Sequence, residues 1–432
     1  VRLRSRAVHR GRPCLTSPSS VGSGPIRGLF IQPGVFGGEL FVVSATTLYR
    51  AGASVGTIAG TDMVRFAASA TQLVIVANGS AYAYDGSTLT LIDDTDLPAV
   101  TDVVFIGGRF VFGLQNSSRF RWSDTSSATT VDGLAFSNAE SSPDYIVGLA
   151  IALGQLVIFG STSVEFWDLT GNDDEPFQHA GSGTYLRGCV SRDAIVVADN
   201  SVFWIGDDRI IYRGKSVPER VSNHGIEAAL KSCTSLSSAT AFEARVEGHA
   251  FLVVNVPGVT TFALDLAAPQ ASDGWAEWSS YGRTTFRGRC SVMSSGDVLV
   301  GDEVAGNVYT LASGVYSDNG DPVTFLASAF IKGANKAERC NNIVVQGARG
   351  VGLATGQGSD PITELRFSDD QGRSWSDWFQ ASPGAVGQYK DRAVWQRMGL
   401  VREPGRVLEI RTTDPVLATL TGLLVNQERP YG

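Results

Sequence analysis

The sequence has few of the side chains that build thiolate or imidazole metal sites. Its five cysteines lie far apart along the chain: Cys14, Cys189, Cys233, Cys290 and Cys340. Its four histidines are equally scattered: His9, His179, His224 and His249. No Cys-x-x-Cys pair or Cys/His cluster occurs, so we predict no metal and no cofactor, with only an all-oxygen site left open. The odd number of cysteines argues against a disulfide framework and favours assembly in a reducing cytoplasm.

Long apolar runs and positive charge are also scarce. No stretch approaches the ~20 apolar residues that a membrane helix requires, and no signal-peptide core follows the N-terminus, so we predict a soluble chain. The net charge of −8 excludes a generally basic surface of the kind that follows nucleic acid. Charged residues make up only 18% of the chain and glycines number 49, which favours a turn-rich β protein.

A hairpin pattern is present seven times. Each copy has a turn residue, an apolar run, a break of Gly, Asn, Asp or Ser, and a second run that is often aromatic. The copies are Gly38–Arg50, Thr71–Gly86, Gly108–Asp124, Gly154–Asp168, Asp193–Gly206, Gly248–Asp265 and Gly296–Leu311. Their starts are 43 residues apart on average, within the roughly 40–50 residues of a propeller blade. We therefore predict an all-β fold with a β-propeller of six or seven blades over residues 28–316.

The segment before the propeller, residues 1–27, is predicted to be an irregular arm. It is rich in arginine, with His9 beside Arg2, Arg4, Arg6, Arg10 and Arg12. Such an arm either contacts phosphate or an acidic neighbour, or it is a solvated terminus. The second interpretation is favoured because isolated charge runs usually stay solvated.

The pattern changes after Tyr316, where the breakers Ser317–Pro322 predict a domain boundary. We predict a β-sandwich-like domain over residues 317–432. Its expected strands are Val323–Ile331, Asn341–Gln346, Ile362–Ser368, Trp395–Leu400, Val407–Arg411 and Thr419–Leu424.

One helix is predicted, over Ser222–Lys231, where Ser222 or Asn223 can cap the first turn. His224 lies in it and could serve as a base or ligand. No nucleophile or carboxylate pattern accompanies it, so we interpret it as a capping or packing residue.

A structural motif lies in the C-terminal segment. Five residues fit the S-x-D-x-G-x-[ST]-W pattern of an Asp-box: Ser368, Asp370, Gly372, Ser374 and Trp375. In this motif the Asp and Ser side chains close a tight hairpin on backbone groups, Gly takes the positive φ, and Trp packs underneath. The motif is familiar from sialidases. A sialidase-like site also requires an arginine cluster and a tyrosine nucleophile with an acidic partner, and no spacing in this sequence identifies such a set.

Three tryptophans occupy the second run of a hairpin: Trp122, Trp167 and Trp204. We predict that they pack at blade junctions, with an exposed anchor for a partner as the alternative. Two acidic turns, 172–175 and 93–96, are interpreted as solvated loops rather than sites for a cation or a basic neighbour. No catalytic residue is predicted.

Several strings, in this order, resemble the packaged-DNA stabilisation proteins of short-tailed phages. They are GPIRGLF (Gly24–Phe30), Gly38–Arg50, QLVIVANGSAYAYDG (Gln72–Gly86), Asp96–Phe112, RFRWSD (Arg119–Asp124), VEFWDLTG (Val164–Gly171), Ser201–Gly214, Pro218–Leu230, LRFSDDQGRSWSDW (Leu365–Trp378) and Gly387–Leu400. The likeness covers nearly the whole chain from about Gly24.

The resemblance implies a structural protein of the virion tail, the hub or nozzle, with no enzymatic activity. It implies a homo-oligomeric ring, six-fold, that assembles in the host cytoplasm below the portal and adaptor proteins. There the ring closes the DNA exit channel, stabilises packaged DNA, and supports the tail needle and the tailspikes or fibres. DNA would pass through the channel without sequence-specific binding.

Two other classes of protein fit a propeller. One is a glycan-binding or glycan-hydrolysing propeller, sialidase-like. The other is a WD-type interaction platform, which is disfavoured because Phe166-Trp167-Asp168 stands nearly alone as a Trp-Asp strand end.

Overall fold

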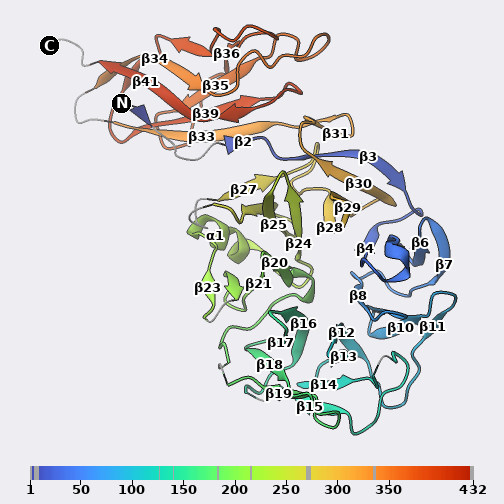
Figure 1. Cartoon of the computed structure of the whole chain (residues 1–432). Helices are drawn as coiled ribbons and strands as arrows, with labels where there is room; N and C mark the ends of the chain where they lie inside the picture. The colour runs from blue at the N-terminus through green and yellow to red at the C-terminus, as the bar shows by residue number, and fades with distance from the viewer. Residues whose placement is uncertain are drawn as a thin grey trace. The chain divides into compact units, whose positions relative to one another are not determined.

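The computed structural model describes residues 2–3, 9–125, 127–139, 141–181, 184–214, 217–268, 274–333 and 337–428 (Figure 1). The chain forms two compact units. One unit comprises Ser17–Leu311, and the other joins Val1–Thr16 to Ala312–Gly432.

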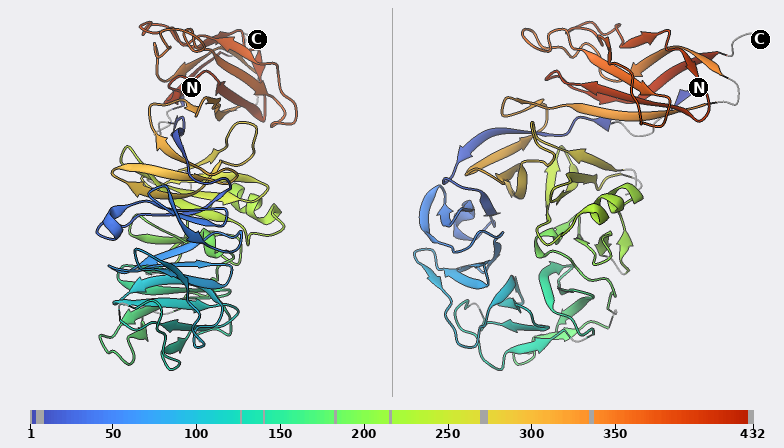
Figure 2. Two further views of the ribbon diagram at one scale, coloured as in Figure 1. Left: turned by 90° about the vertical axis from the view of Figure 1, so that its right-hand side faces the viewer. Right: turned by 180° about the vertical axis from the view of Figure 1, so that it is seen from behind.

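The Ser17–Leu311 unit is a β-propeller. In the described part of the chain, seven antiparallel four-stranded sheets follow one another around a ring, as both face-on views show (Figures 1 and 2). The count resolves the predicted six or seven blades to seven. The first strand of each blade lies nearest the centre of the ring and the fourth lies at its rim.

The strands of the first four blades are as follows. Blade 1 has β4 (Ile26–Phe30), β5 (Phe41–Ser44), β6 (Thr47–Arg50) and β7 (Ala53–Thr57). Blade 2 has β8 (Arg65–Ala68), β9 (Leu73–Ala77), β10 (Ser80–Tyr84) and β11 (Leu89–Leu91). Blade 3 has β12 (Val100–Ile106), β13 (Arg109–Leu114), β14 (Arg119–Trp122) and β15 (Phe136–Asn138). Blade 4 has β16 (Ile146–Ala152), β17 (Gln155–Gly160), β18 (Val164–Leu169) and β19 (Phe177–His179).

Three more blades complete the ring. Blade 5 has β20 (Val196–Ala198), β21 (Ser201–Ile205), β22 (Ile211–Gly214) and β23 (Glu219–Arg220). Blade 6 has β24 (Thr240–Val246), β25 (His249–Val256), β26 (Thr260–Asp265) and β27 (Trp275–Trp278). Blade 7 has β28 (Gly288–Ser294), β29 (Asp297–Asp302), β30 (Asn307–Ala312) and β3 (Cys14–Ser20). Two short 3₁₀ turns, η1 (Phe36–Gly38) and η2 (Arg192–Ala194), lie in blade 1 and just before β20.

Blade 7 takes its outer strand from the other end of the chain. Strand β3 pairs with β30, and the pairing continues in a hydrogen bond from Val21 N to Gly306 O (2.6 Å). The segment over which we expected an irregular arm thus contains a regular strand. Its sequence, CLTSPSS, lacks the alternating apolar residues that usually indicate a strand. A strand at the rim of a blade is mostly exposed, so few of its side chains need to be apolar.

The propeller core lies between successive blades. Blades 2 and 3, for example, enclose Val74, Val76, Phe110 and Phe112, all fully buried. Every residue of β9 is buried, because a strand in the middle of a blade is covered on both faces by its neighbours. This explains why the second strands are continuous apolar runs in the sequence rather than alternating ones.

The hairpins use the turn residues that the sequence indicates. Asn78 and Gly79, between β9 and β10, both have positive φ, 48° and 78°. A two-residue hairpin turn of this kind matches the right-handed twist of the flanking strands, and Asn-Gly adopts it with little strain.

The predicted helix is confirmed as α1 (His224–Ser232), between β23 and β24. Asn223 caps it, since its side-chain oxygen accepts a hydrogen bond from Ile226 N (3.1 Å). The Ser222 hydroxyl donates instead to the Glu227 carboxylate (3.0 Å). The side chain of His224 is 95% exposed and its Nδ1 lies 3.9 Å from Glu227, so it neither packs in a core nor caps the helix.

The C-terminal unit is a β-sandwich, as predicted. One sheet has the order β1 (Arg2–Leu3), β41 (Gly422–Glu428), β34 (Glu338–Gln346) and β37 (Val394–Gln396), with β38 (Leu400–Val401) also paired to β34. The other has the order β33 (Phe325–Lys332), β39 (Gly405–Thr412), β35 (Thr363–Ser368) and β36 (Phe379–Ala381). Two small ladders add β2 (His9–Arg10) with β40 (Thr419–Leu420), and β31 (Ser317–Asp318) with β32 (Asp321–Pro322). Side chains of both large sheets, such as Ile343, Leu365, Leu408 and Val425, share one core.

Two predicted strands are divided in the structure. The expected strand Trp395–Leu400 becomes β37 and β38, because Arg397 and Gly399 have positive φ (57° and 79°) and break the extended run. The expected strand Thr419–Leu424 becomes β40 and β41, which pair with different partners. The predicted breakers at Ser317–Pro322 form the tight ladder β31–β32.

Candidate functional site

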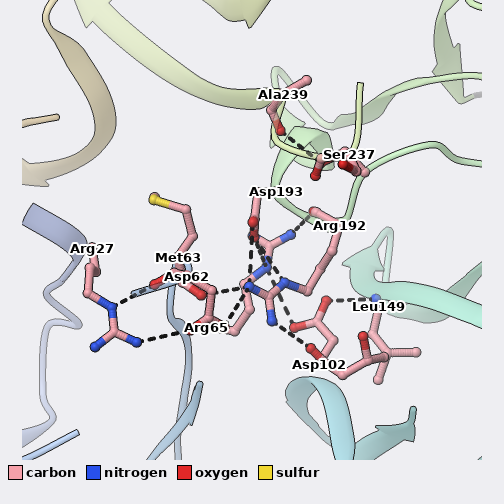
Figure 3. Close-up of polar contacts among 12 residues, drawn as sticks. Arg27, Asp62, Met63, Arg65, Asp102, Leu149, Arg192, Asp193, Ser237 and Ala239 are labelled. Carbon is pink, nitrogen blue, oxygen red and sulfur yellow. Dashed lines mark hydrogen bonds and ion pairs between the residues drawn. The ribbon is translucent and has the colours of Figure 1, made fainter. Parts of the chain in front are cut away.

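A buried polar network lies at the first strands of several blades of the propeller (Figure 3). Arg65 begins β8 of blade 2, Asp102 lies near the start of β12 of blade 3, and Arg192 lies in η2, directly before β20 of blade 5. Because first strands surround the axis, residues far apart in sequence meet here.

Arg192 connects three blades. It donates hydrogen bonds to the backbone carbonyls of Met63 (2.6 Å) and Thr101 (2.8 Å), which precede or begin the first strands of blades 2 and 3. Its Nε is 2.9 Å from the Asp193 carboxylate. Burial alone would lower the pKa of Arg192, but Asp193 and Asp102 raise it above its usual value. The guanidinium therefore stays charged in a mostly buried position.

Arg65 reaches toward Arg192 from the other side. It donates a hydrogen bond to the Arg192 carbonyl, and its Nε lies 3.6 Å from Asp102 and 3.8 Å from Asp193. Blades 2 and 5 are not neighbours in the ring, since blades 3 and 4 separate them on the shorter side. These contacts therefore span the axis of the propeller.

Asp102 is fully buried in the network. Its two oxygens accept backbone hydrogen bonds, one from Val103 N (2.8 Å) and one from Leu149 N of β16 (2.9 Å). Burial raises the pKa of Asp102, and the charges of Arg65 and Arg192 oppose that effect. The carboxylate thus joins blade 3 to blade 4 while facing the arginines of blades 2 and 5.

Arg27 of β4 extends the network to blade 1. Its guanidinium is fully buried and donates to the Asp62 carbonyl (2.6 Å) and the Asp62 carboxylate (3.0 Å). Further hydrogen bonds go to the carbonyls of Ala45 (2.9 Å), Ile58 (3.0 Å) and Ala59 (2.9 Å). Burial lowers the pKa of Arg27, and Asp62 counters only part of that effect. We call Arg27, Asp62, Arg65, Asp102, Arg192 and Asp193 the axial bridge.

The side chains of the axial bridge are suited to stabilising the propeller rather than to catalysis. Arginine keeps its proton at physiological pH and so cannot act as a base. Both oxygens of Asp102 are occupied by backbone amides. Removing one member of such a buried, paired set typically costs about 3–5 kcal/mol, because the remaining charge is left without compensation.

Sequence analysis did not predict the axial bridge. The sequence does contain a signal for this network. Near the start of several first strands, one charged residue stands among apolar residues: Arg27, Arg65, Asp102 and Arg289. Recognising it requires knowing that these strand starts converge, which only the closed ring provides.

The structure buries the three singled-out tryptophans at junctions between consecutive blades. Each ring meets a phenylalanine of the adjacent blade in a T-shaped contact: Trp122 with Phe177 (5.6 Å between centroids), Trp167 with Phe120 (5.0 Å) and Trp204 with Phe159 (5.5 Å). The Trp204 indole also donates to Gly188 O (3.2 Å). In these positions the rings cannot serve as exposed anchors for a partner.

The Asp-box residues form a closed network of hydrogen bonds after β35. The Ser368 hydroxyl donates to Asp370 (2.7 Å) and accepts from Gly372 N (2.7 Å). Asp370 also accepts from the amide (2.8 Å) and the hydroxyl (2.6 Å) of Ser374. These bonds, led by the Ser374 hydroxyl, hold the pKa of Asp370 well below its usual range. Gly372 has a φ of 89°, which favours glycine.

The last Asp-box residue belongs to a stack that sequence analysis missed. The Arg366 guanidinium lies 4.5 Å from the centroid of Trp375 and 4.6 Å from that of Trp378, and Arg411 lies 3.9 Å from Trp378. Arg366 is fixed by Glu409 on the neighbouring strand (2.7 Å). The tryptophans thus cover charged side chains on the outer face of the sheet.

The arginine-rich start is divided between described and undescribed residues. Arg4 and Arg6 lie outside the described residues, and of Arg2 and His9 only the backbone, in β1 and β2, is described. The Arg12 side chain is 7% exposed and pairs with Asp318 through two hydrogen bonds, while Asp318 also accepts from Leu15 N (2.9 Å). Arg12 is therefore a structural residue of the C-terminal unit.

The acidic turns have local roles. In 93–96, Asp94 accepts from Asp96 N (2.8 Å) and from Val131 N (3.2 Å). In 172–175, Asp173 pairs with Arg109 (3.2 Å). Among the described residues no group of three His, Cys, Asp or Glu side chains is arranged to hold a metal ion. In the same residues, no helix is long and apolar enough to span a membrane.

Tyr212, like Tyr309, has the acidic and basic neighbours that a sialidase-like nucleophile would require. The Tyr212 hydroxyl donates to Asp208 (2.6 Å) and accepts from Arg187 Nε (3.2 Å). Burial, followed by the hydrogen bond to Asp208, raises the pKa of Tyr212 to about 12. A nucleophile needs a lowered pKa, and this ring instead packs on Trp204. The arrangement is structural.

Seven blades around a bridged axis, closed by an N-terminal strand and followed by a sandwich, define a β-propeller protein with an appended β-sandwich. The family described as "Bacteriophage P22 Gp10, beta-propeller" matches residues 14–316, and the one described as "Bacteriophage P22 Gp10, beta-sandwich" matches residues 325–428. The chain belongs to the P22 Gp10 family of phage tail hub and DNA-stabilisation proteins.

Individual relatives are distant. The tail hub protein gp10 of Salmonella phage P22 is 23% identical over 418 residues, which cover 90% of this chain and 85% of that protein. Among solved structures, the designed Ika8 protein is 15% identical, with a TM-score of 0.41, over 72% of this chain and 99% of that one. The WD40 domain of Neurospora crassa Pan2 is 10% identical, with a TM-score of 0.42, over 69% and 98% of the two chains.

Proposed function

We propose that this chain assembles as a homo-oligomeric ring, six-fold, in the tail of the virion below the portal and adaptor proteins. There it closes the DNA exit channel, stabilises packaged DNA, and supports the attachment of the tail needle and of tailspikes or fibres. Membership of the Gp10 family and similarity to a tail hub protein support this role.

The axial bridge carries the ring part of the proposal. Arg65 and Arg192 meet across the propeller axis through a direct hydrogen bond and shared carboxylates. Side chains that bond across an opening leave no passage for a nucleic acid duplex through it. A channel for DNA therefore has to form between copies of the chain, around a common axis, rather than within one propeller.

The negative net charge of the chain is consistent with a channel through which DNA passes. With a net charge of −8 and a pI near 5.2, the chain lacks the excess of lysine and arginine that would hold phosphates. A negative channel lining would repel the DNA backbone and let it slide during release.

A mass measurement tests the proposal. The purified chain is examined alone and mixed with portal–adaptor complexes, by light scattering and negative-stain imaging. We expect a ring of several copies on the portal complex, and we expect the chain to fill the position below the adaptor. A matched sample with portal lacking the adaptor controls for non-specific association.

A chain that stays monomeric with portal–adaptor complexes and instead hydrolyses a glycan would overturn the proposal. That result would favour the alternative of a glycan-active propeller.

A further inference from the structure

A cleft of about 570 Å³ opens in the β-sandwich beside the edge strands β36 and β37, which end the two sheets. Its volume falls in the range of about 300–1,000 Å³ that is typical of small-ligand sites. Aromatic, amide, carboxylate and guanidinium groups all line it. None of its lining residues belongs to the axial bridge.

One wall of the cleft is a stack of rings that ends in an exposed phenylalanine. The buried Arg406 guanidinium lies 3.8 Å from the centroid of Phe367. Phe367 is stacked with Phe379, with 6.1 Å between centroids and an angle of 3° between planes. Phe379 is 41% exposed. The stack fixes the orientation of an apolar ring that faces solvent in the cleft.

Asp369 supplies a fixed hydrogen-bond acceptor next to this ring. Both of its oxygens accept from Arg406, at 2.6 and 2.8 Å, and its side chain is still 51% exposed. Asp369 stands between Ser368 and Asp370, so the hydrogen bonds of the Asp-box hold its backbone in place. Each carboxylate oxygen has a second lone pair, which leaves capacity for ligand hydroxyl groups.

Arg397 supplies the uncompensated charge of the cleft. Its backbone is held in the left-handed region, at a φ of 57°, by a hydrogen bond from its amide to Asn341 O (2.8 Å). Within the described ranges, no carboxylate pairs with its guanidinium. Because Arg406 already neutralises Asp369, the cleft carries a net positive charge.

We propose that this cleft binds an acidic saccharide. The apolar face of a sugar ring would pack on Phe379. Hydroxyl groups of the sugar would donate to Asp369 and form hydrogen bonds with the side-chain amides of Gln380 and Gln396. The sugar carboxylate would pair with the guanidinium of Arg397. The site is one of binding, not hydrolysis, and it is independent of ring assembly.

Calorimetric titration of the full chain tests the site with two matched probes. A hyaluronan tetrasaccharide carries glucuronate carboxylates, and tetra-N-acetylchitotetraose, here called chitotetraose, is an uncharged chain of the same length. We expect the hyaluronan tetrasaccharide to bind about tenfold or more tightly than chitotetraose, the factor that a charge-assisted hydrogen bond supplies. Equal affinities, or no binding of either probe, would overturn the proposal.

Two pairs of variants assign the binding to the cleft. Arg397→Gln is expected to abolish the tenfold preference, whereas Arg402→Gln, an exposed arginine outside the cleft, should leave it intact. Phe379→Ala is expected to weaken both probes at least tenfold. Phe330→Ala, which removes a similarly exposed ring (47%) outside the cleft, should not change either affinity.

Thermal melts of all four variants establish that they are folded. If the control variants lost affinity as much as the cleft variants, the site would lie elsewhere and the proposal would fail. Binding of the Arg397→Gln variant to the portal–adaptor complex is measured in parallel, and we expect it to be unchanged. A failure of the saccharide proposal can then be distinguished from a failure of the tail-hub proposal.

Discussion

Arg192 shows how one buried side chain can join parts of a ring that are distant in sequence. Its bonds to Met63 and Thr101 and its pair with Asp193 lie on three different blades. Each bond alone is worth about 1 kcal/mol, but the pairing of buried charges makes the loss of the whole side chain more costly.

Arg192→Met keeps an unbranched side chain but removes the guanidinium group and its charge. We expect it to lower the free energy of unfolding of the propeller by about 3–5 kcal/mol, because Asp193 then loses its nearest counter-charge and Arg65 alone remains to compensate Asp102 and Asp193. Urea unfolding followed by tryptophan fluorescence measures the change. The control Arg245→Met breaks an exposed pair with Glu243, in which the arginine is 55% exposed, and should cost less than about 1 kcal/mol. Equal losses in the two variants would contradict the role of the axial bridge.

The lowered pKa of Asp370 predicts that the stability of the C-terminal unit depends on pH. Hydrogen bonds from Ser374 and Ser368 hold the pKa of Asp370 below its unfolded value, so its carboxylate stabilises the fold above about pH 4. This stabilisation is lost as the pH falls through the folded pKa. Asp370→Asn should therefore melt at a lower temperature than the parent at neutral pH, and the difference should shrink steadily in increasingly acidic buffers. Thermal melts across the acidic range check it, and a constant difference would be the contrary result.

The closing strand is the critical element of the propeller. Strand β3 supplies the rim of blade 7, and without it β30 is an unpaired edge. Unpaired edges recruit other chains and promote aggregation. Closure by the N-terminal strand also links the first blade to the last, so that the seven sheets form one continuous ring.

A chain that lacks residues 1–20 should have a less stable propeller and should aggregate at lower temperature than the full chain. Addition of a peptide spanning residues 12–22 is expected to restore part of the stability, and a scrambled peptide of the same composition should not. Light scattering during heating measures both effects. A truncated chain that melts like the full chain would show that β3 is dispensable.

Elements differ in how well the sequence predicts them. Hairpins such as Asn78-Gly79 depend on two residues and their neighbours, and they formed as predicted. The strand Trp395–Leu400 did not, because the positive φ of Arg397 arises from its contact with Asn341 on another strand. Strand β3 has no strand pattern of its own and exists because β30 offers it a partner.

At the scale of the whole molecule, the chain consists of two units with separate cores. We expect calorimetry to resolve two unfolding transitions. Arg192→Met should shift only the transition of the propeller, and Asp370→Asn only that of the sandwich. A single transition that both variants shift would contradict independent unfolding.

The sequence alone determined the architecture of this protein and much of its family likeness. Short apolar runs, turn residues and the Asp-box depend on interactions within a few residues, so the repeat of about 43 residues was enough to indicate propeller blades. The tertiary structure decided the rest. Seven blades, the rim strand β3, the axial bridge and the cleft around Asp369 each join residues far apart along the chain. Their partners become neighbours only when the ring closes and the two sheets pack.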